Sequence, residues 1–156
     1  MYIIEGNIGV GKSTFLSLIQ KHLPSIKYML EPVDTWAHQK FGQSLLEQFY
    51  TAPERWAYTI ETLAMVSRSR DHVAIQQKEP HYLMERSIYS GHYCFALNGK
   101  RAGYFRDVEW DAYEQWVNFI IHNKCSPPHG FIYLQADVDV CHARIAKRKR
   151  HGESMI

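Results

Sequence analysis

The chain of 156 residues has the length of a single domain with its own hydrophobic core, and we expect one domain over residues 1–156. Hydrophobic residues make up 46% of it, which excludes an intrinsically disordered protein. The formal net charge is only +2 and no apolar run is long enough to span a membrane, so we expect neither nucleic acid nor a membrane as partner.

The cysteines and histidines argue against disulfide bonds and a zinc site. The three cysteines are odd in number and far apart, and no Cys-x-x-Cys occurs. The nine histidines show none of the spacings typical of metal ligands. A predicted strand begins at the N-terminus and leaves no room for a signal peptide. These features predict an intracellular, cytoplasmic protein with reduced thiols.

The first predicted elements are a strand, a glycine-rich loop and a helix. Residues 2–5 have the composition of a buried strand, and residues 6–13 read Gly-x-x-x-x-Gly-Lys-Ser. Apolar residues then recur at helical spacing until Pro24. In this context the loop is a phosphate-binding P-loop, whose backbone N–H groups face phosphate oxygens at the positive end of a helix. We expect Lys12 to reach the β- and γ-phosphates and Ser13 to hold Mg²⁺.

Three more strands are predicted, over residues 27–31, 81–85 and 131–135. The helical patterns between them indicate an α/β fold, with a parallel sheet that has helices on both faces. Ligands of such folds bind beyond the carboxyl ends of the strands. Glu31 and Glu85 each end a predicted strand at that edge, where the P-loop also lies.

The helices between the strands have recognisable starts. Residues 51–54 read Thr-Ala-Pro-Glu, a predicted capping box with proline in the first turn, and open a long helix. Asp107 or Asp111 is expected to cap the next helix, and Asp137 the last one. That last helix runs into basic residues, which form either a solvated helix end or a phosphate contact. They are Arg144, Lys147, Arg148, Lys149 and Arg150.

The two carboxylates at the strand ends suggest phosphoryl transfer. Glu85 is expected to hold Mg²⁺ through water, with Arg86 positioning a phosphate acceptor, unless the two form a plain surface ion pair. Glu31 can accept the proton of an attacking hydroxyl, and in a loose transition state such a base mainly orients the nucleophile. The alternative for Glu31 is an ion-paired or helix-capping carboxylate.

Three motifs in this order resemble the deoxyribonucleoside kinase family, which includes the deoxycytidine, deoxyguanosine and mitochondrial thymidine kinases and the insect multisubstrate enzyme. They are the P-loop, Glu-Pro-Val-x-x-Trp at residues 31–36, and Glu-Arg-Ser-Ile-Tyr-Ser at residues 85–90, followed by the arginine-rich helix end. The resemblance covers the whole chain. It implies a P-loop kinase fold, a homodimer, and transfer of the ATP γ-phosphate to the 5′-hydroxyl of a deoxyribonucleoside with Mg²⁺.

The same resemblance implies a role for individual residues. The catalytic residues would be Glu31, Arg86 and Lys12. The ATP phosphates would contact the P-loop and a lid over residues 144–156, through Gly6, Asn7, Ile8, Gly9, Val10, Gly11, Lys12, Ser13, Thr14, Arg144, Arg148 and Arg150. Ser13 and Glu85 would hold the metal.

The resemblance also implies a nucleoside site. Trp36 and Phe95 would be walls around the base, and Tyr50 and Glu153 would hold the sugar 3′-hydroxyl. The full set of implied substrate-binding residues is Glu31, Trp36, Tyr50, Glu61, Arg68, Arg86, Phe95 and Glu153.

The chain departs from the family at the residue that reads the base, where Glu61 replaces the usual glutamine. Glutamine offers one donor and one acceptor, whereas an ionised glutamate only accepts. Arg68 lies two helical turns further on, and Gly91 replaces the aspartate that partners this arginine in the family, so we expect Arg68 to pair with Glu61. This predicts thymidine or deoxyguanosine over deoxycytidine. The alternative is that Glu61 is protonated or turned away into an ion pair.

A second departure is length, since the family continues past the lid with further helices and a fifth parallel strand. We therefore expect a chain that lacks the C-terminal portion of the family. Two rival functions remain: a nucleoside monophosphate kinase and an inactive nucleotide-binding module. The Tyr50 and Glu153 pair favours a neutral sugar over a monophosphate, and the intact catalytic set argues against an inactive module.

Overall fold

The computed structural model describes residues 1–33, 36, 44–78 and 82–148 of the chain. Its elements follow one another as β1 (Tyr2–Gly6), α1 (Lys12–His22), β2 (Lys27–Met29), α3 (Leu45–Thr51), α4 (Pro53–Gln76), β3 (Tyr82–Glu85), α5 (Ile88–Ser90), η1 (Gly91–Ala96), α6 (Leu97–Arg101), α7 (Asp107–Asn123), β4 (Gly130–Leu134) and α8 (Val138–Arg148). The four strands form one sheet in the order β2-β3-β1-β4, and every neighbouring pair is parallel.

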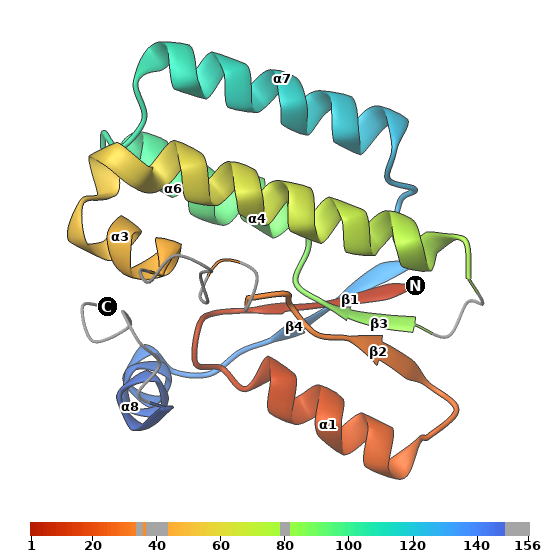
Figure 1. Ribbon diagram of the computed structural model, residues 1–156. Helices are drawn as coiled ribbons and strands as arrows, with labels where there is room; N and C mark the ends of the chain where they lie inside the picture. The colour runs from red at the N-terminus through yellow and green to blue at the C-terminus, as the bar shows by residue number, and fades with distance from the viewer. Residues whose placement is uncertain (34–35, 37–43, 79–81, 149–156) are drawn as a thin grey trace.

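The sheet lies between α1 on one face and α4 with α7 on the other (Figure 1). Successive residues of a strand point to opposite faces, and the packing follows that alternation. Ile3 packs with Ile75 of α4, whereas Ile4 packs with Leu16 of α1. The predicted α/β class, with a parallel sheet and helices on both faces, is confirmed.

The largest difference between the predicted and the observed strands is at the C-terminal end of β2. β2 ends at Met29, so Glu31 lies two residues beyond the strand and not at its last position. Glu31 begins a tight turn, in which the N–H of Val33 donates to the carbonyl of Glu31 at 2.8 Å. Pro32 lies inside this turn and has no N–H with which to continue the sheet.

The predicted capping box at Thr51 is wrong. Thr51 is the last residue of α3, and its hydroxyl donates to the carbonyl of Glu47 at 2.9 Å. α4 begins at Pro53 after Ala52, which caps it without a side-chain hydrogen bond. The Thr-x-x-Glu pattern is present, but it spans the junction of two helices, so the threonine is already used by the first.

The start of α7 also differs from the prediction by one residue. Asp107 is its first helical residue, Asp111 lies inside it, and the cap is Arg106, whose N–H donates to the Glu109 carboxylate at 3.0 Å. Asp107 and Glu109 still favour this end, because negative charge stabilises a helix N-terminus. α8 begins directly after Asp137, as predicted. None of the described helices combines the length and the apolar composition of a membrane span.

Replacing Gly9 or Gly103 with alanine distinguishes the energetic cost of backbone strain from the cost of a close contact. Both glycines have a left-handed φ, 80° and 83°, which costs another residue about 1–2 kcal/mol. A Cβ at Gly9 would collide with the carbonyl oxygen of Cys141 in α8, whereas one at Gly103 would meet nothing within 4 Å. We expect G9A to lower the free energy of unfolding in urea by about 1–3 kcal/mol more than G103A. Equal losses would contradict a tight contact between the P-loop and α8.

Candidate active site

The P-loop joins β1 to α1 and has the shape of an anion site. Gly6, Gly9 and Gly11 have φ of 148°, 80° and 106°, conformations that favour glycine. The buried Lys12 folds back over the loop and donates from Nζ to the carbonyls of Gly6 at 3.1 Å and Asn7 at 3.0 Å. Burial, together with the nearby Arg86 guanidinium, lowers the pKa of Lys12 to about 8. The first turn of α1 holds no acidic residue that would compete with a phosphate.

Ser13 and Glu85 lie side by side beneath the loop. The Ser13 hydroxyl reaches both carboxylate oxygens of Glu85, at 2.9 and 3.0 Å. Neighbouring oxygens in an octahedral Mg²⁺ shell are about 3 Å apart, so this pair fits two positions of such a shell. Within the described ranges no three His, Cys, Asp or Glu residues form a metal cluster. A Mg²⁺ ion here would take further ligands from phosphate and water, as Mg²⁺ commonly does.

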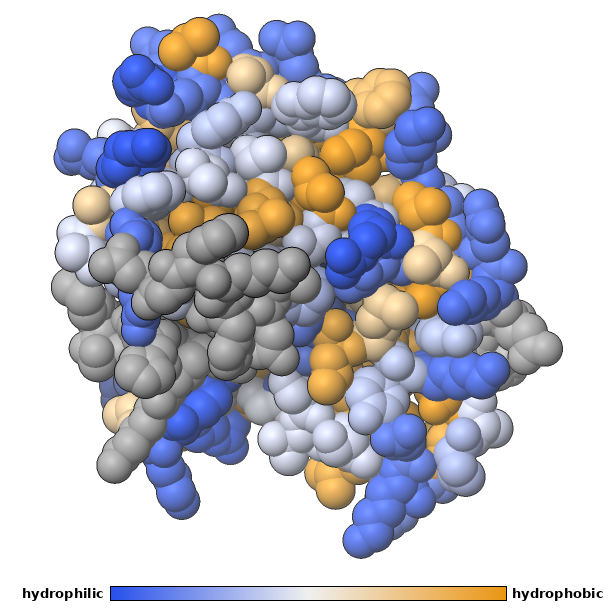
Figure 2. All heavy atoms as spheres, viewed as in Figure 1, coloured by the Kyte–Doolittle hydropathy of each residue, from blue (hydrophilic) through white to orange (hydrophobic). Residues whose placement is uncertain are grey.

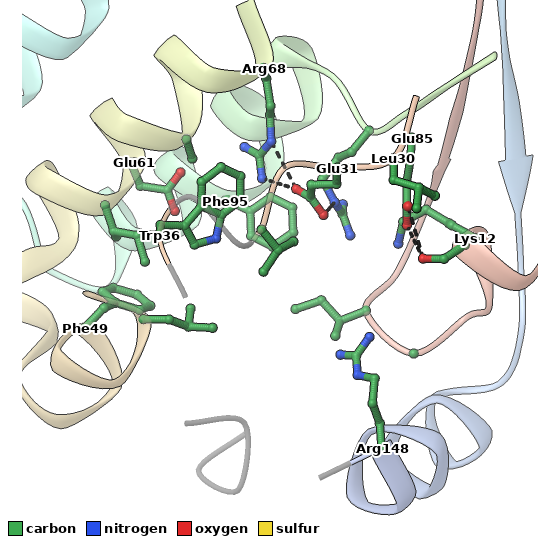
Figure 3. A pocket seen from close by; sticks show the side chains of 18 of the residues that line it. Lys12, Leu30, Glu31, Trp36, Phe49, Glu61, Arg68, Glu85, Phe95 and Arg148 are labelled. Atoms are coloured by element: carbon green, nitrogen blue, oxygen red, sulfur yellow. Dashed lines mark hydrogen bonds and ion pairs between the residues drawn. The ribbon is translucent and has the colours of Figure 1, made fainter. Parts of the chain in front are cut away.

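Glu31 is held between two arginines from different elements (Figure 3). Its Oε1 accepts from Arg68 of α4, at 2.6 Å from Nη2 and 3.1 Å from Nε, and its Oε2 accepts from Nε of Arg86 at 3.3 Å. Burial raises the pKa of Glu31, but the charges of Arg68 and Arg86 outweigh burial and hold it below 4.5. The carboxylate is therefore ionised at neutral pH.

Arg86 is held in an unusual backbone conformation directly after β3. Its φ is 66°, the only positive value among the described residues other than glycine. A long side chain adopts this conformation at a cost of about 1–3 kcal/mol. Its N–H donates to Ile4 of β1 at 3.0 Å, and its Nη1 lies 3.9 Å from Oε2 of Glu5. These contacts hold the strained turn and direct the guanidinium toward Glu31.

A cavity of about 380 Å³ is lined both by the charged residues described above and by aromatic side chains. Glu61 and Trp36 lie at one end, and Lys12 and Glu85 lie at the other (Figure 3). Phe95, from the π-helix η1, packs under the guanidinium of Arg86, whose Cζ is 4.6 Å from the ring centre. The cavity is lined by Ile8, Gly9, Lys12, Ser13, Leu30, Glu31, Val33, Trp36, Leu46, Phe49, Tyr50, Ile60, Glu61, Ala64, Arg68, Glu85, Arg86, Phe95 and Arg148.

A second, more open cavity of about 920 Å³ lies on the other side of the P-loop. Arg144 lines it and donates from Nη1 to the carbonyl of Val10 at 2.8 Å. The residues common to both cavities are Gly9, Lys12, Ser13, Glu85 and Arg148. The two cavities thus adjoin at the P-loop and at the Ser13 and Glu85 pair.

Seven of the predicted substrate residues line the first cavity: Glu31, Trp36, Tyr50, Glu61, Arg68, Arg86 and Phe95. Arg150 and Glu153 lie outside the described residues. Sequence reasoning did not place four apolar residues in this cavity: Leu46, Phe49, Ile60 and Ala64. It also missed Glu5, which accepts from Ser87 at 2.6 Å. The signal for Glu5 was a carboxylate in an otherwise apolar strand.

The expected pairing of Arg68 with Glu61 is wrong. Arg68 binds Glu31, and its remaining Nη1 is buried with no hydrogen-bond partner. That atom occupies the space beside Gly91, where a Cβ would lie 2.6 Å from it. Burial raises the pKa of Glu61 to about 7. The positive charge of Arg68 lowers that pKa, but it offsets only part of the effect of burial.

Replacing Glu31 with glutamine leaves the buried Arg68 without its ion-pair partner, and leaves the buried Arg86 with only the longer contact to Glu5. We expect E31Q to lose about 3–5 kcal/mol of stability at neutral pH, measured by denaturation. The pKa of Glu31 is lower in the folded than in the unfolded state. The ionised carboxylate therefore stabilises the folded protein above pH 4.5, and this contribution is lost as the pH falls through the folded pKa. The difference between the wild type and E31Q should therefore shrink in acid.

E109Q is the matched control for that variant. Glu109 and Arg106 are also 2.6 Å apart, but Arg106 is 78% exposed, whereas Arg68 is 6% exposed. Solvent screens such a pair, so the change should have a much smaller effect. Similar losses for E31Q and E109Q would contradict a special role for burial.

Comparison with known proteins agrees with this arrangement. The family model described as deoxynucleoside kinase matches residues 2–156. The chain is 34% identical to deoxycytidine kinase 2 of Gallus gallus, with 98% of this chain and 66% of the relative covered. It is 32% identical to a probable deoxycytidine kinase of Fowlpox virus (strain NVSL), with 98% and 63% covered.

A third relative is the mitochondrial deoxyguanosine kinase of Xenopus laevis, which is 30% identical over 98% of this chain and 65% of its own length. The chain thus spans about two thirds of the length of these curated relatives. The family match extends over nearly every residue, including the P-loop, Glu31 and Glu85. The chain belongs to the deoxynucleoside kinase family.

Proposed function

We propose that this chain transfers the γ-phosphate of ATP to the 5′-hydroxyl of a deoxyribonucleoside, with Mg²⁺ as cofactor. The observation that carries this proposal is the meeting of two cavities at Lys12, Ser13 and Glu85, with Glu31 on the side of the aromatic cavity. ATP phosphates would enter from the open cavity, and the nucleoside would occupy the aromatic one.

On the donor side, the chain supplies a cation, backbone N–H groups and a metal pair. Lys12 would exchange the carbonyls of Gly6 and Asn7 for phosphate oxygens. Ser13 and Glu85 would hold Mg²⁺, which when bound neutralises charge on the β- and γ-phosphates. Arg144 and Arg148 line the donor cavity and would contact the same phosphates.

On the acceptor side, Glu31 would accept a hydrogen bond from the 5′-hydroxyl and take its proton as the new P–O bond forms. The bond from the γ-phosphorus to the bridging oxygen breaks, and ADP leaves. The lowered pKa of Glu31 makes it a weak base, which suits a loose transition state in which orientation matters most. Arg86 and Lys12 would stabilise charge on the transferred group.

The arginines of the acceptor cavity favour a neutral acceptor. Arg68 and Arg86 both bind Glu31, so a carboxylate already balances part of their charge before an acceptor binds, which favours a neutral nucleoside over a nucleoside monophosphate. Trp36 and Phe95 would flank a flat base, and Tyr50 would contact the sugar. Glu153 is proposed as its partner on the lid over residues 144–156.

We further propose a base preference, a dimer and a compartment. An ionised Glu61 accepts N–H groups, which favours thymidine or deoxyguanosine over deoxycytidine. Apolar side chains are exposed along α4 and α7 (Figure 2), among them Val66, Trp116 and Phe119, and this surface supports a homodimer. The free thiols of Cys94, Cys125 and Cys141 support a cytoplasmic location.

The function is tested by ADP production from ATP with each deoxynucleoside and each monophosphate. We expect turnover with deoxynucleosides, and a loss of about 10²- to 10⁴-fold in kcat for E31Q. E109Q should retain full activity. Turnover only with monophosphates would establish the rival kinase, and ATP binding without any turnover would establish an inactive module.

The metal pair is tested by the Mg²⁺ dependence of that activity. S13A removes one proposed ligand, so we expect it to raise the Mg²⁺ concentration for half-maximal rate about 10- to 100-fold. S17A is the control on the same helix, because the Ser17 hydroxyl donates only to the backbone carbonyl of Ser13 at 2.9 Å. An unchanged Mg²⁺ requirement in S13A would remove Ser13 from the metal site.

A further inference from the structure

Glu61 lies at the aromatic end of the acceptor cavity without a hydrogen-bond partner among the described residues. It projects from α4 near Trp36, and Phe95 lies next to Trp36 in the same view (Figure 3). A half-buried carboxyl in a slot with aromatic walls is placed to read the polar edge of a flat ligand.

The surrounding charges leave Glu61 without a dedicated counter-ion. Arg68 faces it from its own helix but is bound to Glu31 at 2.6 Å, and Arg86 is shared by Glu31 and Glu5. Glu31 itself faces Glu61 and opposes a second negative charge. From the neighbouring helices, Tyr113 of α7 interacts with Glu61, and Tyr50 of α3 lines the same cavity.

In these surroundings both the neutral and the ionised form of Glu61 are populated near neutral pH. Burial is the largest influence, and it raises the pKa of Glu61 to about 7. A neutral carboxyl offers one donor and one acceptor, as an amide does, whereas a carboxylate offers acceptors only. The hydrogen-bonding pattern at this end of the cavity therefore changes near neutral pH.

We propose that Glu61 makes the base preference of the acceptor cavity depend on pH. This inference rests on the proposed function. The neutral carboxyl donates to the ring nitrogen of cytosine or adenine and accepts from its amine. The carboxylate instead accepts from the ring N–H of thymine or guanine. Glu61 lies at the end of the cavity away from Lys12 and Glu85 (Figure 3), and any effect of its charge on Glu31 acts on every base alike.

The test is the ratio of kcat/KM for deoxycytidine to that for thymidine, measured at about pH 6 and about pH 8. Over that range the neutral fraction of Glu61 falls from about 0.9 to 0.1, so the ratio should fall by up to about 100-fold. Titration of Lys12 affects both substrates alike and cancels in the ratio. E61Q keeps a donor and an acceptor at every pH, so its ratio should stay constant and favour deoxycytidine.

Thermal unfolding gives a readout that needs no turnover. The folded pKa of Glu61 lies above its unfolded value of 4.5, so its stabilisation is full below that pH and is lost as the pH rises through about 7. The wild type should lose stability relative to E61Q over this window. A constant difference would overturn the inference.

The outcomes separate the inference from the proposed function. A wild-type ratio that does not change with pH, in an active enzyme, overturns the inference alone. If no deoxynucleoside is phosphorylated at any pH, the proposed function fails. The inference is then decided by the ratio of dissociation constants for the same two nucleosides, read from tryptophan fluorescence.

Discussion

The buried contact of Glu31 with Arg68 and Arg86 is the constraint on which the site depends. It joins three segments that are distant in sequence: the turn after β2, the middle of α4 and the turn after β3. A charge removed from water is tolerated only when it is paired, so these segments have little freedom to move apart. The strained φ of Arg86 persists because this contact and the hydrogen bond to Ile4 hold it.

The same contact determines charge at both ends of the acceptor cavity. It keeps Glu31 ionised near the P-loop, where a phosphate acceptor would be oriented. It also engages Arg68, which leaves Glu61 to bear the cost of burial without a bound cation. The chemistry proposed for the hydroxyl end and the selectivity proposed for the base end therefore have a common electrostatic origin.

Much of the fold was predictable because its signals are local. The strands alternate with helices, and the P-loop pattern lies between the first strand and helix, as in the structure. The errors fall at the ends of helices, where a short local pattern does not fix the capping residue. Thr51 matches a helix cap, but it is still bonded inside α3. Asp107 also matches a cap, but the actual cap is Arg106, which a Glu109 side chain makes possible.

The sequence by itself determined the phosphate end of the site, because eight consecutive residues contain the glycines, Lys12 and Ser13, and their geometry follows from the chain between one strand and one helix. Only the tertiary structure decided the partner of Arg68. Glu61, seven residues away on the same helix, was the expected partner, yet Glu31, 37 residues away in sequence, is the one that binds it. The fold places the turn after β2 next to the middle of α4, and such long-range proximity is not encoded in local spacing.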